Sequence, residues 1–161
     1  ERSRGLGDVY KRQVIKPGER VLKTFIDFSV INDSGNVIDA SSLAAVAALA
    51  TSKVPDVKEL KEVEEANLKD VKKVPLSIKD LPVSVTIANL SGHLLVDPCA
   101  EEEFVMDARL TFTFTERGEI CAVQKGGEGT FDLDHVLEAI KIAEKVSGEV
   151  RNKLKGMLSL K

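Results

Sequence analysis

One stretch of the chain decides the fold: Asp107-Ala108-Arg109-Leu110-Thr111-Phe112-Thr113-Phe114. Apolar and polar residues alternate through it without a break, which is typical of a β-strand with one buried face and one solvated face. The residues predicted to point inward are Ala108, Leu110, Phe112 and Phe114. The residues predicted to point outward are Asp107, Arg109, Thr111 and Thr113. A strand of this kind needs neighbours, and the segments on both sides of it have the composition to provide them.

Hairpin signals lie on both flanks of this strand. A turn at Glu116-Arg117-Gly118-Glu119 leads into a return strand over 120–124. Upstream, residues 83–88 alternate in the same way, Ser91-Gly92 turns the chain, and 93–96 return it. After a glycine-rich loop at 126–129 the chain ends in an amphipathic helix, which Asp132 or Asp134 can cap. The apolar stripe of this helix is Val136, Ile140, Ala143, Val146, Val150 and Leu154.

The region before residue 80 predicts more varied structure. Lys16-Pro17-Gly18-Glu19 indicates a turn, and the alternation over 20–31 predicts a half-buried strand. Asn32-Asp33-Ser34-Gly35-Asn36 then favours a hairpin whose return strand starts at Val37-Ile38. An alanine-rich helix is expected from about Ser41 to Ser52, capped by Asp39 or Ser41 and buried because it is apolar nearly all round.

Residues 56–73 are densely charged, since 11 of these 18 residues are Asp, Glu or Lys. The segment is interpreted as a solvated surface excursion. Its type stays open between a helix and a hairpin whose tip lies near Ala66-Asn67.

Length and composition exclude several classes of protein. The 161 residues suffice for one compact domain, and 43% hydrophobic with 30% charged residues is ordinary globular composition. The chain has 23 Lys and Arg residues and 26 Asp and Glu residues, so its net charge is 23 − 26 = −3. This charge excludes a histone-like, polybasic mode of binding nucleic acid. Cys99 and Cys121 are too few for a disulfide scaffold, which favours a reduced, cytoplasmic protein. We expect no membrane insertion, because no apolar run approaches the roughly 20 residues of a membrane span.

The first 13 residues do not follow the pattern of the rest. They show no helical or strand period, and Asp8-Val9-Tyr10-Lys11-Arg12-Gln13 looks like the translation of a transposase-end adapter sequence. We therefore expect 1–13 to be an artefactual leader. The alternative is a genuine disordered arm whose basic residues touch RNA, namely Arg2, Arg4, Lys11 and Arg12.

No arrangement of residues predicts a nucleophile with its base. His93 lies in a predicted strand and His135 opens the last helix, and neither has the spacing of a zinc site or a catalytic triad. Lys125-Gly126-Gly127-Glu128-Gly129-Thr130 lacks the spacing of a P-loop and is interpreted as a structural turn rather than an anion site.

A group of carboxylates near residue 100 was the best candidate for a divalent cation. Its members are Asp97, Glu101, Glu102, Glu103 and Asp107. A solvated acidic loop is the favoured interpretation, because contiguous side chains diverge. We therefore expect no metal and no cofactor.

Several stretches together resemble one family: Val14-Ile15-Lys16-Pro17-Gly18-Glu19-Arg20-Val21, Asp39-Ala40-Ser41-Ser42-Leu43, Asp80-Leu81-Pro82-Val83-Ser84-Val85-Thr86, Leu95-Val96-Asp97-Pro98, Glu101-Glu102-Glu103, Met106-Asp107-Ala108-Arg109-Leu110 and Gly126-Gly127-Glu128-Gly129. They closely resemble the RNase-PH-like subunits of the RNA exosome. The resemblance is greatest to the archaeal subunit that is not itself catalytic, and it covers about 14–161. Each motif alone is weakly specific, whereas their combination is specific.

The resemblance implies a fold, partners and an activity. The fold is the RNase PH fold, an α/β (α+β, two-layer) domain like domain 2 of ribosomal protein S5, of which 14–161 would be the C-terminal part with the N-terminal half missing. Three heterodimers of a catalytic and a non-catalytic subunit form a hexameric ring, and S1/KH-type subunits cap one face. The assembled complex binds RNA and shortens it from its 3′ end with inorganic phosphate as the nucleophile.

The resemblance also implies which residues matter for catalysis. Catalytic relatives carry a Gly-Thr/Ser-Arg phosphate-binding stretch at the start of the alanine-rich helix, where this chain has Val37-Ile38-Asp39-Ala40-Ser41. They also carry an aspartate at the place of Asp107, thought to be a general acid or a metal ligand. Asp107 is therefore expected to be vestigial or structural, pairing with Arg109 or a neighbouring backbone donor.

Three hypotheses follow for the function. The leading one is a non-catalytic structural subunit of the archaeal exosome ring, which supports 3′-to-5′ degradation by its catalytic partner. The alternative is an active phosphate-dependent exoribonuclease with Asp107 as acid. A stand-alone binding domain with an S5-like fold is the third, and co-purification with a catalytic ring partner would exclude it.

Overall fold

The computed structural model describes residues 14–16, 18–62 and 70–158. The predicted leader at 1–13, Pro17 of the first turn and the predicted tip at Ala66-Asn67 lie outside these described residues. The chain divides into two compact units, one from 1–27 with 52–76 and the other from 28–51 with 77–161. Among the described residues, no helix combines the length and apolarity that a membrane span requires.

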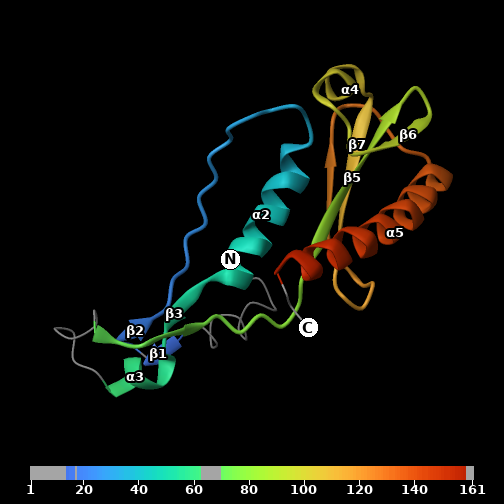
Figure 1. The fold of residues 1–161 in the computed structure, drawn as a ribbon. Coiled ribbons are helices and arrows are strands. Elements are labelled where there is room, and N and C mark those ends of the chain that lie inside the picture. The colour runs from blue at the N-terminus through green and yellow to red at the C-terminus, as the bar shows by residue number, and fades with distance from the viewer. Residues whose placement is uncertain (1–13, 17, 63–69, 159–161) are drawn as a thin grey trace. The chain divides into compact units, whose positions relative to one another are not determined.

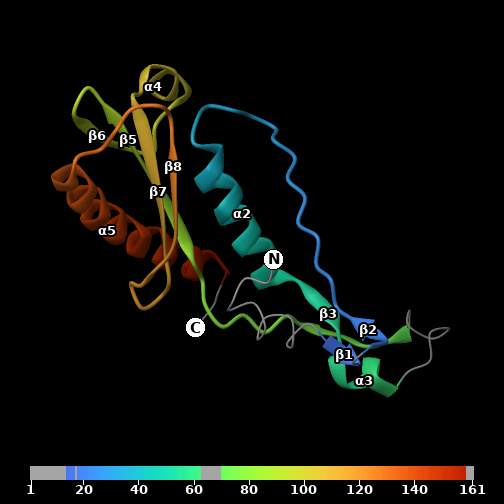
Figure 2. The same ribbon diagram turned by 180° about the vertical axis from the view of Figure 1, so that it is seen from behind.

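The larger unit is built on an antiparallel sheet with the strand order β6-β5-β7-β8. Figure 2 shows β6 at one edge of this sheet and β8 at the other. The strands are β5 (Val83–Leu90), β6 (His93–Val96), β7 (Ala108–Phe114) and β8 (Ile120–Gly126). Both predicted hairpins are confirmed, with Ser91-Gly92 joining β5 to β6 and Gly118 at positive φ between β7 and β8.

The predicted inward face of β7 is confirmed. Its four apolar residues are all buried, and three of them, Leu110, Phe112 and Phe114, form the core of this unit together with Val83, Val85 and Ile87 of β5. The outward prediction for Thr111 is wrong, because this side chain is buried. Its hydroxyl lies 2.8 Å from that of Thr86, which is also buried, so the second face of the sheet is covered where β5 and β7 carry these two threonines.

Helix α5 (Leu133–Leu158) covers the apolar face of the sheet (Figure 1). Asp132 caps it, because the Asp132 carboxylate accepts a hydrogen bond from the backbone N–H of His135 at 2.7 Å. The predicted apolar stripe packs against the core as expected. The residues of α5 that are buried most deeply are smaller than that stripe suggests, namely Ala139, Ala143 and Ser147, and small side chains let the helix lie close to the strands.

One buried charge ties α5 to the ends of two strand segments. Arg151 is buried, and its guanidinium donates to the carbonyl of Leu81 at 2.9 Å and to that of Phe114 at 2.8 Å. A guanidinium has a fixed fork of donors, so a single side chain can reach both carbonyls. Arg151 therefore fixes the position of α5 along the sheet.

Helix α2 (Val37–Thr51) differs from the prediction in two ways. It begins at Val37 rather than near Ser41, because Asn36 and not Asp39 or Ser41 is the residue that precedes its first turn. The predicted return strand at Val37-Ile38 is therefore wrong. The helix is also half-buried rather than buried, since none of its residues is fully covered.

The predicted strand over 20–31 is wrong apart from its first residues. Only β2 (Arg20–Val21) is a strand, pairing with β1 (Val14–Lys16), and 22–30 are extended without strand pairing. Within the described residues no strand lies beside 22–31, so its backbone lacks the ladder partner that a strand requires. Apart from Leu22, which packs against a small core, its apolar side chains are exposed, with Phe25 at 71% and Ile31 at 99%.

The smaller unit contains the charged excursion. Strands β3 (Lys53–Pro55) and β4 (Lys73–Pro75) pair antiparallel, and α3 (Val57–Glu62) follows β3 directly. In its described residues the excursion combines both predicted types, since the short helix α3 lies between two paired strands. Leu60 and Val71 of this segment are buried with Ile15 in a small core.

Substituting Arg151 tests the link between α5 and the strand ends. Arg151→Met should lower the free energy of unfolding by about 2 kcal/mol, because two buried carbonyls lose a charged donor. Urea denaturation measures this, with Lys153→Met on the exposed side of the same helix as the matched control, expected within about 0.5 kcal/mol of wild type. Equal effects of the two substitutions would contradict the role given to Arg151.

Candidate functional site

The start of α2 is held by a residue that the prediction placed in a hairpin loop. Asn36 is 3% exposed and has a φ of 46°, in the left-handed region. Its Oδ1 accepts a hydrogen bond from the backbone N–H of Asp39 at 3.4 Å, which is the geometry of a helix N-cap. Its Nδ2 donates to the carboxylates of Asp39 at 2.9 Å and Asp97 at 2.7 Å.

Gly35 allows this arrangement, because its backbone packs against the loop before helix α4 (Ala100–Val105). Its φ is +111°, and a Cβ at this position would lie 2.5 Å from the Pro98 carbonyl oxygen. The Ser34 carbonyl accepts a hydrogen bond from the Ala100 N–H at 2.9 Å across the same contact. The segment before α2 is therefore fixed to the segment after β6.

The carboxylate of Asp39 connects α2 to β5. Its Oδ2 accepts from the backbone N–H of Thr86 at 2.6 Å, and its Oδ1 accepts from the Thr86 hydroxyl at 2.9 Å. With the bond from Asn36, one carboxylate takes three donors. Bonds from neutral donors to a charged acceptor are stronger than neutral pairs, which makes this the strongest polar contact between α2 and the sheet.

Two rows of hydroxyl groups extend this contact across the sheet. Ser42 of α2 lies 2.9 Å from Ser84 of β5, which lies 2.9 Å from Thr113 of β7. The second row consists of Asp39, Thr86 and Thr111, and in it the Thr86 hydroxyl donates its only proton to the Asp39 carboxylate. The Thr111 hydroxyl must therefore donate to Thr86 in the 2.8 Å contact between them.

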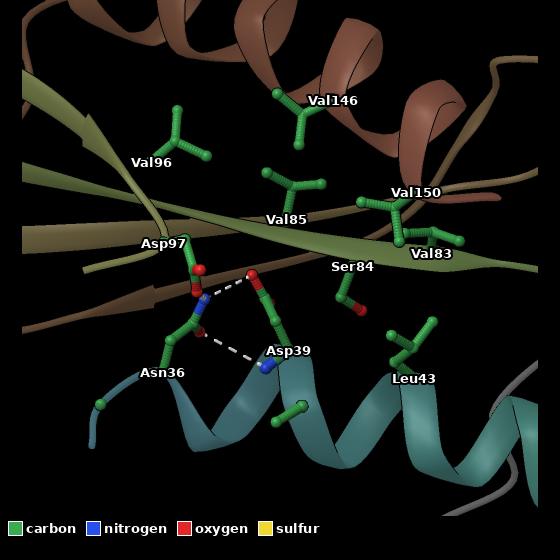
Figure 3. A pocket seen from close by; sticks show the side chains of 12 residues that line it. Asn36, Asp39, Leu43, Val83, Ser84, Val85, Val96, Asp97, Val146 and Val150 are labelled. Carbon is green, nitrogen blue, oxygen red and sulfur yellow. Dashed lines mark hydrogen bonds between the residues drawn. The ribbon is translucent and has the colours of Figure 1, made fainter. Parts of the chain in front are cut away.

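A cavity of about 330 Å³ opens beside this contact. Figure 3 shows α2 and α5 on opposite sides of β5, with Asn36, Asp39 and Asp97 grouped at one end of the cavity. Its apolar wall consists of Leu43, Val83, Val85, Val96, Val146 and Val150. The polar end contributes two carboxylates, and the lining contains no Lys, Arg or His.

Asp107 lies elsewhere. It is exposed, and its Oδ2 accepts a hydrogen bond from the backbone N–H of Ser91 at 2.7 Å, at the turn between β5 and β6. Asp107 was expected to pair with Arg109 or with a backbone donor, and the structure shows the backbone donor, the N–H of Ser91. Arg109 pairs instead with Glu103 at 3.5 Å. Asp107 also bonds through its own N–H to the carbonyl of Asn89. Asn89 and Thr86 are three residues apart on β5, about 10 Å, so Asp107 is not part of the cavity.

The structure does not bring the five candidate carboxylates together. Asp97 bonds to Asn36 and Asp107 to Ser91, while the three glutamates lie in α4 (Ala100–Val105). The predicted acidic loop is therefore wrong, since a six-residue helix starts after Cys99, whose N–H donates to the Glu102 carboxylate at 2.8 Å. Across the described part of the chain, no group of three or more His, Cys, Asp or Glu side chains is arranged to hold a metal ion.

The first turn of α4 changes the acidity of two of its groups. The backbone N–H of Glu101, and then the Cys99 thiol, lower the pKa of the Glu101 carboxyl. The backbone N–H of Glu102 lowers the pKa of the Cys99 thiol, but the Glu101 carboxylate, desolvation and the Glu102 carboxylate together raise it above its usual value.

The glycine-rich loop serves as a structural turn. The N–H of Gly129 donates to the carbonyl of Asp107 at 2.8 Å, and a Cβ on Gly127 would lie 2.9 Å from that same oxygen. The Nδ1 of His135 lies 3.0 Å from the Asp132 carboxylate, and His93 lies on the edge strand β6. Neither histidine lines the cavity.

Two residues of the site were not predicted. Asn36 carried a usable signal, because Asn is a favoured N-cap, but the same residue also fits a hairpin loop. Thr86 carried no signal, since a threonine in an alternating strand is expected to face solvent. Its importance comes from Asp39, which lies 47 residues away in the sequence.

Two domain models of the 3′ exoribonuclease family match the chain, domain 1 over residues 1–55 and domain 2 over residues 80–146. The chain is 47% identical over 145 residues to the exosome complex component Rrp42 of Methanopyrus kandleri, covering 89% of this chain and 53% of that protein. It is 42% identical over 144 residues to Rrp42 of Thermococcus onnurineus, with the same two coverages. The chain thus spans about half the length of the curated relatives it matches.

Solved structures agree with this similarity. A chain of a structure described as an archaeal exosome core aligns with a TM-score of 0.77 and 35% identity, over 89% of this chain and 55% of that chain. A chain of the Archaeoglobus fulgidus exosome with RNA bound to the active site aligns with a TM-score of 0.67 and 34% identity, over 78% of this chain and 46% of that one. At 34% and 35% identity, the similarity to these two chains extends to the sequence as well as the fold.

A glycine pair tests the packing that holds Asn36. Gly35→Ala should lower the free energy of unfolding by at least about 2 kcal/mol, because the added Cβ meets the Pro98 and Cys99 backbone at a positive φ. Gly148→Ala in α5 is the matched control, since no atom lies within 4 Å of its Cβ, and it should stabilise by up to about 1 kcal/mol. Urea denaturation that ranks the two variants in the opposite order would contradict this packing.

Proposed function

Because the chain belongs to the 3′ exoribonuclease family of RNase PH proteins, we propose that it is part of a non-catalytic, structural subunit of an archaeal exosome ring. In this role it supports 3′-to-5′ phosphorolytic degradation of RNA by a catalytic RNase-PH-like partner. The ring is a trimer of such heterodimers, carries S1/KH-type cap subunits and binds RNA as an assembled complex. The protein would act in the cytoplasm.

The observation that carries the proposal is the charge at the start of α2. In phosphorolysis an oxygen of inorganic phosphate attacks the terminal phosphodiester. A P–O bond forms to that oxygen, and the bond to the 3′ oxygen of the preceding nucleotide breaks. The 3′ oxygen takes a proton and a nucleoside diphosphate leaves. The incoming dianion must therefore be held close to another anion, which requires cations or free donors.

At the start of α2 this chain has carboxylates in place of the cations that a phosphate would need. Asp39 and Asp97 place two carboxylates at the polar end of the cavity, and the donors that converge there are already bonded to them. The resemblance to catalytic relatives leads us to expect an arginine in the same stretch, where this chain has Asp39. A phosphate ion would meet repulsion rather than a binding site.

One observation favours the alternative of an active exoribonuclease. Asp107 stands where catalytic relatives carry an aspartate, and its carboxylate is exposed with one hydrogen bond from Ser91. Such a carboxylate can accept a proton, and once protonated it can donate one. Because the start of α2 offers carboxylates instead of cations to a phosphate, we interpret Asp107 as the structural cap of the β5–β6 turn.

An RNA-shortening assay separates the two functions. The full-length protein, its catalytic partner and their mixture are each incubated with RNA in phosphate buffer, and nucleoside diphosphate release is measured. The full-length protein alone should release none, and the mixture should exceed the partner alone. Asp107→Ala should change the rate of the mixture by less than about twofold, because this carboxylate touches no reacting atom.

Two results would decide against the proposal. Release by the full-length protein alone, abolished by Asp107→Ala, would establish the active exoribonuclease instead. Failure of the two subunits to co-purify, with no gain of activity on mixing, would favour a stand-alone binding domain.

A further inference from the structure

The donors around Asp39 have the geometry of an anion-binding site. The Thr86 N–H, the Thr86 hydroxyl and the Asn36 amide point at one carboxylate from 2.6 to 2.9 Å. Thr86 is fully buried and Asn36 nearly so, so the protein itself supplies the acceptor for these donors. Among the contacts of the described residues, no lysine or arginine pairs with Asp39, and neutral donors alone hold the charge.

The Thr86 N–H is available because β6 is short. The pairing of β5 with β6 ends at Ile87 and Val96, so it stops one residue short of Thr86. The Thr86 carbonyl still accepts from the Asp97 N–H at 3.3 Å, and the N–H of the same residue points to the same edge. Asp39 therefore occupies the place at which a longer β6 would have supplied a carbonyl.

The cavity provides space next to these donors. Asp39 is part of its lining, and a volume of about 330 Å³ exceeds what a three-atom anion needs. Shortening the Asp39 side chain would remove the carboxylate that separates the donors from this space. The donors would then face a cavity open to solutes.

We infer that Thr86 and Asn36 form an anion-binding cradle whose ligand is the chain's own Asp39 carboxylate. Asp39 is thus a specificity-determining residue that closes the cavity to external anions, and the latent ligand of the cradle is a small carboxylate such as formate. This inference goes beyond the proposed role in an exosome, because it concerns what the cavity binds whether or not the protein joins a ring.

Rescue by formate tests the inference. Asp39→Gly removes the internal ligand, so its urea midpoint should fall in sodium chloride and rise again in sodium formate of equal ionic strength. At formate concentrations ten times the dissociation constant, the unfolding equilibrium constant should drop about tenfold. Wild type and Asp39→Asn, in which the cradle stays filled, should respond equally little to the change of salt.

Two further variants keep the test decisive. The double variant Asp39→Gly/Thr86→Val lacks the principal hydroxyl donor and should lose most of the formate response. If Asp39→Gly does not fold in chloride, the midpoint of Asp39→Ala and the refolding yield of both variants in the two salts give the answer. A response to formate no larger than that of wild type, or one that survives Thr86→Val unchanged, would overturn the inference.

Discussion

The carboxylate of Asp39 carries the contact on which the arrangement of the larger unit depends. It joins the first turn of α2 to the free edge of β5 through the backbone and side chain of Thr86. Asn36 extends the same contact to Asp97 and so to the end of β6. Each bond to the charged oxygen contributes about 1.5–3 kcal/mol, a large share of a small domain's stability.

This interaction has a chemical consequence as well as a structural one. A helix start beside a strand edge presents backbone N–H groups, and such groups attract anions. Here the anion is part of the chain, and Asp97 adds a second negative charge within reach of the same amide. The site that holds α2 in place is thereby unsuited to phosphate, which links the fold to the proposed non-catalytic role.

The sequence predicts what depends on local periodicity and misses what depends on distant partners. The alternation over 107–114 and the stripe of α5 identify the core, because both faces of each element are visible within a few residues. The segment over 22–31 has the same alternation yet no partner strand in the described part of the chain, so periodicity alone overestimates it. The start of α2 was misplaced because Asn36 fits a hairpin loop and an N-cap equally well. Asp39 and Thr86 come into contact only in the folded chain, and neither residue type predicts a contact with the other.

We propose that the start of α2 does not hold inorganic phosphate, because the carboxylates of Asp39 and Asp97 occupy its donors. Isothermal titration of the unmodified protein with inorganic phosphate near neutral pH tests it most directly. The account predicts no saturable heat up to tens of millimolar phosphate, about the range in which weak anion sites fill. Saturable binding at one site per chain, lost when Asn36 is replaced by alanine, would contradict it.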